Sequence, residues 1–161
     1  MPSVLRPTTS EDLDFVLTAE NHPDNRDFVS QWTRQQHEEA IADPDALHFI
    51  IEAGGAVGYT ILYGLTEPNQ ALCIQRLVIT QKGKGYGKAT LRLLQKLAFE
   101  DWNAHRLWLD VKDYNQRARH VYESVGFQFE GIMRECAKKG DRFESFAIFS
   151  ILKPEYQSRL S

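Results

Sequence analysis

Hydrophobic and polar positions follow two periods along the chain, and these predict an ordered succession of strands and helices. Alternation with period two predicts strands, and apolar residues three and four apart predict helices. The predicted strands are residues 3–7, two arms of a hairpin within 47–65, 71–80, 106–111, 127–136 and 143–152; the predicted helices are residues 8–20, 28–41, 87–100 and 115–125. The order β-α-α-β-β-β-α-β-α-β-β, without repeats or low-complexity linkers, predicts one α+β domain over residues 1–161.

Turn and capping residues support these boundaries. Thr9 or Ser10 can cap the first helix, and acidic residues follow in its first turn. Gly54 and Gly55 suit the hairpin turn, and Gly126 suits the end of the last helix.

Composition and charge then exclude several classes of function. The 161 residues carry a formal charge of -3, which argues against a general nucleic-acid binder. Cys73 and Cys136 form no CxxC pair, and the five histidines show no metal-ligand spacing, so we expect neither a metal site nor a disulfide framework. Without a leader-like start or a long apolar run, we expect a soluble cytoplasmic protein with no membrane partner.

The glycine-rich stretch QKGKGYGKAT, residues 81–90, lies between a predicted strand and a predicted helix. A Walker loop would require Ser or Thr after its lysine, but Ala89 follows Lys88. A dinucleotide fingerprint GxGxxG would require a third glycine where the chain has lysine or threonine, and it would need an early βαβ unit. Neither nucleotide motif is therefore present.

Bare backbone N–H groups at a helix N-terminus can still receive a phosphate group. Lys82, Lys84 and Lys88 would add positive charge, so a pyrophosphate is the ligand that this stretch suits. The alternative is a flexible glycine turn with solvated lysines.

A second pattern follows on the helix 115–125, where Asn115, Ala118 and Tyr122 share one face. NQRARHVYESVGF, together with KGKGYG, resembles the GNAT superfamily of N-acetyltransferases, whose acetyl-CoA site combines (R/Q)-x-x-G-x-(G/A) with N-x-x-A-x-x-x-Y-x-x-x-G-F. The second pattern matches at every position, and Lys82 is the one departure from the first. RPTTSEDLDFVL and GFQFEGIMRE look most like the branch of ribosomal-protein N-terminal acetyltransferases.

This resemblance implies a mixed, mostly antiparallel sheet of about seven strands flanked by about four helices. It also implies an enzyme that uses acetyl-CoA as co-substrate, needs no metal, and acetylates a primary amine by direct attack on the thioester. The expected assembly is a monomer or a homodimer, and the sequence does not decide between them. The residues that it assigns to acetyl-CoA are Leu77, Val78 and Ile79 by backbone pairing, Lys82, Gly83, Lys84, Gly85, Tyr86, Gly87, Lys88, Ala89 and Thr90 around the pyrophosphate, and Asn115 on the cofactor arm.

The resemblance also implies catalytic roles for two residues. Tyr122 would lie beside the thioester sulfur and donate a hydrogen bond or a proton to the leaving thiolate. Asp110, five residues before the asparagine of the motif, would accept the amine proton directly or through water. The plainer interpretations are a core tyrosine and a solvated strand carboxylate, and Glu67, Glu135 and Glu144 are alternative bases.

The acceptor is not fixed by the sequence. At neutral pH an α-amine costs up to about 1 kcal/mol to deprotonate, whereas a lysine or polyamine amine costs roughly 4–5 kcal/mol. A single carboxylate base therefore favours a protein N-terminal α-amine, while small-molecule amines remain open. Two other classes also remain: a non-catalytic acyl-CoA sensor, which would have no need of Tyr122, and a structural domain without any cofactor.

Overall fold

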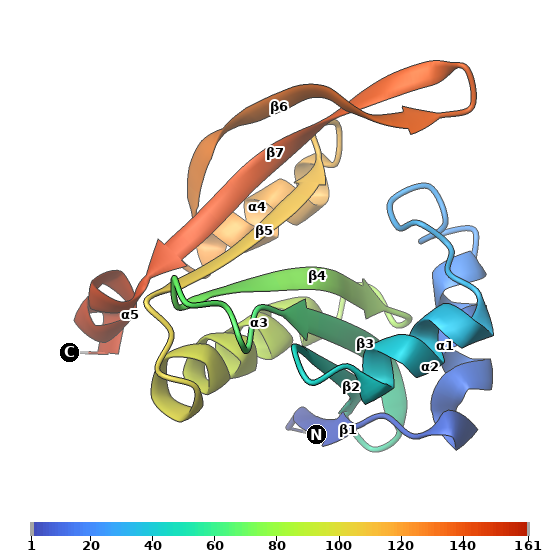
Figure 1. Ribbon diagram of the computed structural model, residues 1–161, viewed down its shortest axis with the longest axis horizontal. Helices are drawn as coiled ribbons and strands as arrows, with labels where there is room; N and C mark the ends of the chain where they lie inside the picture. The colour runs from blue at the N-terminus through green and yellow to red at the C-terminus, as the bar shows by residue number, and fades with distance from the viewer. Residues whose placement is uncertain (1, 161) are drawn as a thin grey trace.

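The computed structural model describes residues 2–160, and its architecture is a seven-stranded sheet with helices on both faces (Figure 1). The strands are β1 (Val4–Pro7), β2 (Ala46–Glu52), β3 (Ala56–Tyr63), β4 (Ala71–Ile79), β5 (Arg106–Lys112), β6 (Gln128–Lys139) and β7 (Arg142–Leu152). The helices are α1 (Leu13–Asn21), α2 (Arg34–Ala42), α3 (Tyr86–Lys96), α4 (Gln116–Ser124) and α5 (Lys153–Leu160). A 3₁₀ turn (Ser10–Asp12) precedes α1, and a π-helical turn (Leu97–Asp101) extends α3.

The strand order β1-β2-β3-β4-β5-β7-β6 makes every neighbouring pair antiparallel except β4 and β5. The predicted mixed, mostly antiparallel sheet of seven strands is therefore confirmed. That residues 1–161 form one domain stays a prediction, and its two end residues lie outside the described range. Within residues 2–160, no helix is long and apolar enough to cross a membrane.

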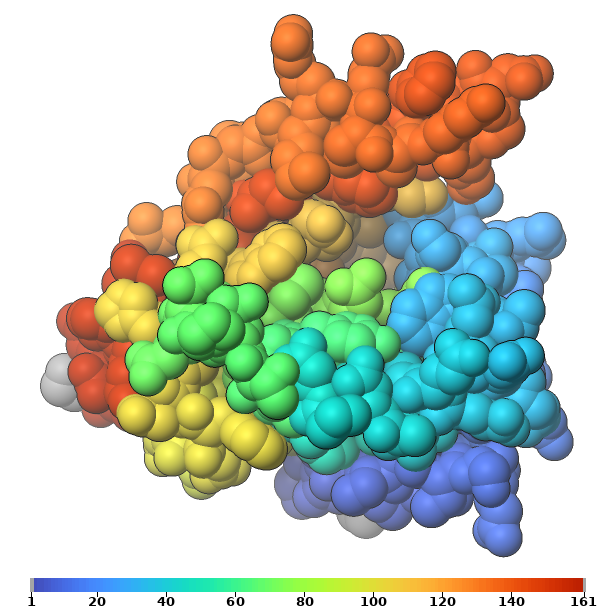
Figure 2. Space-filling model, viewed as in Figure 1, coloured from blue at the N-terminus to red at the C-terminus, as the bar shows by residue number. Residues whose placement is uncertain are grey.

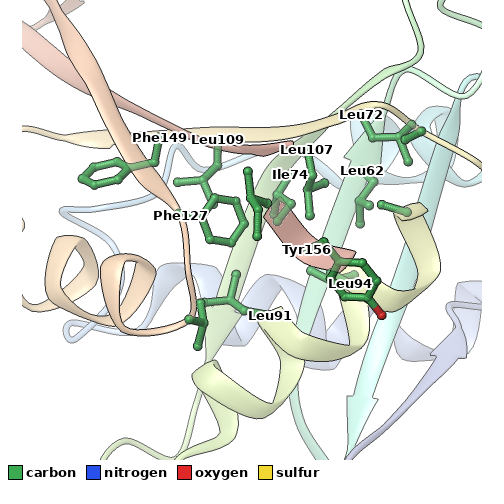
Figure 3. Close-up of a cluster of buried hydrophobic side chains, with 14 of the residues drawn as sticks. Leu62, Leu72, Ile74, Leu91, Leu94, Leu107, Leu109, Phe127, Phe149 and Tyr156 are labelled. Carbon is green, nitrogen blue, oxygen red and sulfur yellow. The ribbon is translucent and has the colours of Figure 1, made fainter. Parts of the chain in front are cut away.

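Two hydrophobic cores lie on opposite faces of the sheet. The larger one packs Leu91 and Leu94 of α3 against residues such as Leu107 of β5 and Phe149 of β7 (Figure 3). The smaller one packs α1, through Leu13 and its buried neighbours, against β2, β3 and β4. Because both faces of the sheet are buried, the ends of its strands are held in fixed positions. A site at those ends requires such fixed positions.

The sheet is split where β4 and β5 meet. Their parallel ladder covers only Ala71–Cys73 against Arg106–Trp108, and beyond it the two strands separate (Figure 1). A β-bulge in β4, where the register against β3 shifts by one residue around Gln75, helps β4 to turn away. The separation leaves the facing edges of two central strands without strand partners.

Two helix predictions differ from the structure. The second helix begins at Arg34, not at residue 28, because Thr33 and Gln36 form a capping box that starts it there. Helix α5 was not predicted from the sequence, and it makes five α-helices in place of about four among the described residues. Pro154 in its first turn and the Glu155 carboxylate, which accepts from the Leu152 amide at 2.9 Å, are the local signals for this helix.

Candidate active site

The N-terminus of α3 offers free backbone donors at one side of the gap. Gly85 precedes the helix in the left-handed conformation, with φ of 79°, and no side chain caps the helix end among residues 2–160. Ala89 is the first residue whose amide bonds back into the helix, to the Gly85 carbonyl at 3.1 Å. Within α3, the amides of Tyr86, Gly87 and Lys88 are therefore available to an anion.

The free amides of α3 therefore end at Lys88, whereas the predicted pyrophosphate contacts extend to Thr90. The Ala89 amide is used within the helix, and the Thr90 side chain is fully buried. Neither of these two residues can offer a donor group to a phosphate. Of the predicted lysines, Lys82 is committed elsewhere, because its Nζ donates to Asn25 Oδ1 at 2.5 Å. Burial, and secondarily the nearby Arg117, lowers the pKa of Lys82.

The glycines leave open space in front of these amides. A Cβ built at Gly83, Gly85 or Gly87 would meet no protein atom within 4 Å. Gly83 and Gly85 have positive φ, so glycine is required there by the backbone. Gly87 has no such requirement, and its missing side chain leaves open space through which a ligand can approach the helix end.

Replacing Gly87 with leucine should therefore weaken acetyl-CoA binding by about tenfold or more, the loss of one hydrogen bond to a charged group. Gly87→Ala is the matched control, because the family pattern accepts alanine there and alanine favours a helix by about 1 kcal/mol. Calorimetry gives both Kd values, and thermal melting checks the fold. An unchanged Kd for a folded Gly87→Leu variant would place the pyrophosphate elsewhere.

The edge of β4 forms the second wall for a cofactor. Leu77, Val78 and Ile79 pair with β3 on one side, and their ladder has no β5 partner on the other. Unpaired backbone groups on a strand edge can accept an extended chain as an added strand. An amide-containing arm such as pantetheine fits this edge.

Asn115 caps α4 and keeps a free donor. Its Oδ1 accepts from the Ala118 amide at 3.2 Å, which caps α4. Its Nδ2 makes no hydrogen bond within the described part of the chain, so the same side chain can still donate to a ligand beside the cap.

Tyr122 lies on α4 with its ring packed against Phe127 and Phe149, at centroid distances of 6.2 and 5.8 Å. Its hydroxyl makes no hydrogen bond to any residue between 2 and 160. Burial raises the pKa of Tyr122 to about 12, and the Asp110 carboxylate adds to the rise. The phenol is therefore protonated at neutral pH and lies close enough to Asp110 to feel its charge.

Asp110 lies on β5, and its side chain points away from the buried side chains of Leu109 and Val111. Burial raises its pKa above the ordinary value for aspartate, and no cation pairs with it within residues 2–160. A carboxylate with a raised pKa binds a proton more readily than a paired one, which is the property of a base. Burial, with help from Asp110, also raises the pKa of the Cys73 thiol to about 12, so Cys73 is no thiolate nucleophile.

The alternative carboxylates have other contacts. Glu67 lies in the β3–β4 turn, at the closed end of the gap, and accepts from the Asn69 amide. Glu135 lies in the bulged part of β6, and is exposed. Although burial acts in the opposite direction, hydrogen bonds from Tyr114 and Lys112 lower the pKa of Glu144. The lowered pKa makes Glu144 a weaker base than Asp110, whose pKa is raised.

Comparison with known proteins identifies the family of this chain. Residues 3–128 match the acetyltransferase (GNAT) domain family. The chain belongs to this family. It is an acetyl-CoA-dependent N-acetyltransferase, so the enzyme interpretation is confirmed and the sensor and structural alternatives are set aside.

Similar proteins include acetyltransferases named for spermidine and for streptothricin. Spermidine N(1)-acetyltransferase of Vibrio cholerae is 24% identical, covering 96% of this chain and 95% of that protein. Streptothricin acetyltransferase of Streptomyces lavendulae is 31% identical, covering 56% of this chain and 49% of that protein. A crystal structure of the V. cholerae spermidine enzyme with CoA and spermine matches with a TM-score of 0.86 and 22% identity, covering 97% and 98% of the two chains. These relatives do not specifically belong to the ribosomal-protein branch, so only superfamily membership is confirmed.

A buried polar network that was not predicted from the sequence lies on the α1–α2 face. Glu20 is fully buried; its carboxylate contacts the His37 ring, accepts from the Trp32 amide at 2.9 Å, and lies 3.7 Å from Arg76. Arg76 in turn stacks over the Trp32 ring at 4.2 Å and donates to the Ser30 carbonyl. The network holds the segment between α1 and α2 against β4. Its one local signal is a glutamate on the apolar face of α1.

Proposed function

We propose that the chain transfers the acetyl group to a primary amine by direct attack on the thioester, with Asp110 as proton acceptor and Tyr122 as hydrogen-bond donor to the leaving thiolate. The observation that carries the proposal is the separation of β4 from β5 beyond Cys73 and Trp108, with Asp110 on the separated part of β5 and its carboxylate close enough to raise the pKa of Tyr122. Acetyl-CoA would supply an activated acyl group, held by the β4 edge and the α3 amides. No enzyme nucleophile is needed.

Asp110 would act before or during the attack. An amine can attack only as the free base, and a carboxylate on the acceptor side of β5 can take its proton directly or through one water. The raised pKa of Asp110 brings it closer to that of an α-amine, which reduces the cost of the transfer.

Tyr122 would act as the C–S bond breaks. A phenol with a pKa of about 12 is a weaker acid than a thiol, whose reference pKa is about 8.5, so full proton transfer to the thiolate would cost about 5 kcal/mol. A hydrogen bond to the thiolate carries no such cost. The proposed role is therefore donation of a hydrogen bond, and the thiolate leaves as an anion.

A thiol-release assay over protein N-terminal peptides, amino acids, polyamines and amino sugars tests this function. Release of CoA with at least one primary amine, with the acetylated amine identified by mass spectrometry, is the expected result. The free-base argument favours an α-amine, in line with the ribosomal-protein branch that the sequence resembles, whereas the spermidine enzymes among the relatives favour a small amine. Binding of acetyl-CoA without turnover of any amine would contradict the proposal.

Asp110→Asn should lower kcat/KM by about tenfold near pH 6, and the deficit should shrink as the pH rises toward 9. Below the pKa of the acceptor amine a proton must be removed, and above it the amine is already free. In the unmodified enzyme the rate should fall as the pH falls through the raised pKa of Asp110, because the protonated carboxyl cannot accept.

The control for this variant is Asp113→Asn, which changes a neighbouring carboxylate that makes no side-chain hydrogen bond or ion pair within residues 2–160. A deficit that stays constant across the pH range would remove Asp110 from the role of base. Glu67, Glu135 and Glu144 would then be the residues to replace.

A further inference from the structure

A pocket of about 410 Å³ lies between the segment after α1 and the hairpin formed by β6 and β7. Its lining residues are Asp27, Phe28, Tyr114, Lys139, Arg142 and Glu144. In Figure 1 the tip of the hairpin extends over the loop between α1 and α2, and Figure 2 shows the hollow beneath the hairpin. None of these residues belongs to the proposed acetyl-CoA site.

The pocket adjoins the proposed base along β5. Asp110 and Lys112 point to the same side of the strand, about 7 Å apart. Lys112 reaches both walls of the pocket, because its Nζ donates to the Asp27 carbonyl at 2.5 Å and lies 3.2 Å from Glu144. An acceptor with its amine at Asp110 could therefore extend over Lys112 into this pocket.

Both carboxylates of the pocket already have partners. Glu144 pairs with Lys112 and accepts from the Tyr114 hydroxyl at 2.9 Å. Asp27 lies 3.8 Å from Lys139. No carboxylate is left to pair with an ammonium group from a ligand.

Arg142 is the cation without a partner. Its guanidinium makes no ion pair or hydrogen bond to any residue between 2 and 160. Three cationic side chains, Lys112, Lys139 and Arg142, thus face two carboxylates, and one positive charge is uncompensated. The rings of Phe28 and Tyr114, 6.0 Å apart, offer an apolar contact beside this charge.

We infer that this pocket binds a carboxylate of the acceptor, so that the preferred substrate is an amine that also carries a carboxylate, and not a polyamine. The inference rests on the proposed function for the placement of the amine. A guanidinium matches a carboxylate with two parallel hydrogen bonds, and a single uncompensated charge suits a monoanion. A polyamine would bring additional ammonium groups toward Arg142 and two lysines.

The test compares two amines of equal chain length, ε-aminocaproate and hexamethylenediamine, for binding to the CoA-bound protein by calorimetry. We expect ε-aminocaproate to bind more tightly, by about tenfold or more. A second pair, the tetrapeptide amides Ala-Glu-Ala-Ala and Ala-Lys-Ala-Ala, repeats the comparison for a peptide N-terminus. A larger preference for the carboxylate in the first pair would indicate a small-molecule acceptor. A larger preference in the second pair would indicate a protein N-terminus.

Arg142→Gln should abolish the preference for the carboxylate in each pair. In acetyl transfer it should raise KM for the carboxylate-bearing amine with little change in kcat. Arg134→Gln, in the same hairpin but outside the pocket, is the matched control and should leave the preference intact. Thermal melting of both variants checks the fold.

Equal or tighter binding of the diamine, or a preference that survives Arg142→Gln, would overturn the inference. Binding of the amino carboxylate without acetyl transfer to any amine would leave the pocket assignment standing and would instead contradict the proposed function. The two hypotheses therefore fail in different measurements.

Discussion

Tyr122→Phe is expected to lower kcat and kcat/KM together by about ten- to hundredfold, with the acetyl-CoA affinity and the melting temperature nearly unchanged. A hydrogen bond to a charged group contributes about 1.5–3 kcal/mol, which corresponds to that range of rates. The bond would be made mainly when the thiolate forms, so its loss appears in the rate and not in binding. Steady-state kinetics and calorimetry measure both.

The structure explains why this substitution should be clean. Phenylalanine keeps the ring contacts of Tyr122 with Phe127 and Phe149, and the hydroxyl that is removed has no hydrogen-bond partner within residues 2–160. Tyr86→Phe serves as a control, because it removes a hydroxyl from a residue proposed to act only through its backbone amide. Full turnover by a folded Tyr122→Phe variant would leave the thiolate to water or backbone groups.

Glu20→Gln is expected to lower the free energy of unfolding by about 3–5 kcal/mol, because it removes the buried negative charge that Arg76 and His37 contact. The total stability of a domain is about 5–15 kcal/mol, so this is a large fraction. Urea unfolding measures the change. Because the charge that Arg76 and His37 contact is lost, the segment between α1 and α2, which includes the pocket residues Asp27 and Phe28, should loosen. KM for the amine should then rise while KM for acetyl-CoA stays the same.

Glu38→Gln is the matched control for Glu20, because Glu38 is exposed on α2 and makes no side-chain hydrogen bond or ion pair within the described chain. Its stability should change by less than about 0.5 kcal/mol. A similar small change for Glu20→Gln would mean that the buried network contributes little to the fold. An unchanged KM for the amine would mean that the network does not position the segment between α1 and α2 for binding of the amine.

Local sequence predicted most of the fold and the cofactor side of the candidate site. The apolar face of α3, with Leu91 and Leu94, follows from a period of 3.6 residues, and both side chains are buried. The glycine loop and the spacing from Asn115 to Tyr122 are contained within short segments, where chain geometry alone fixes which groups share a face. The second helix begins later than its period predicts, and α5 was not predicted at all, because short capping signals compete there with a weak period.

The amino-acid sequence by itself thus determined the strand and helix order, the family resemblance and the helix end that can receive a pyrophosphate. Only the tertiary structure decided which charges are paired. Glu20 and Arg76 are 56 residues apart in the sequence, and Asp27 and Lys139 are 112 residues apart. The two members of each pair nevertheless lie within 4 Å of each other in the fold. Such long-range contacts decide whether Asp110 is free to act as a base and whether Arg142 is left without a carboxylate partner. Electrostatic interactions depend on distance in space and on burial, and a local sequence pattern specifies neither.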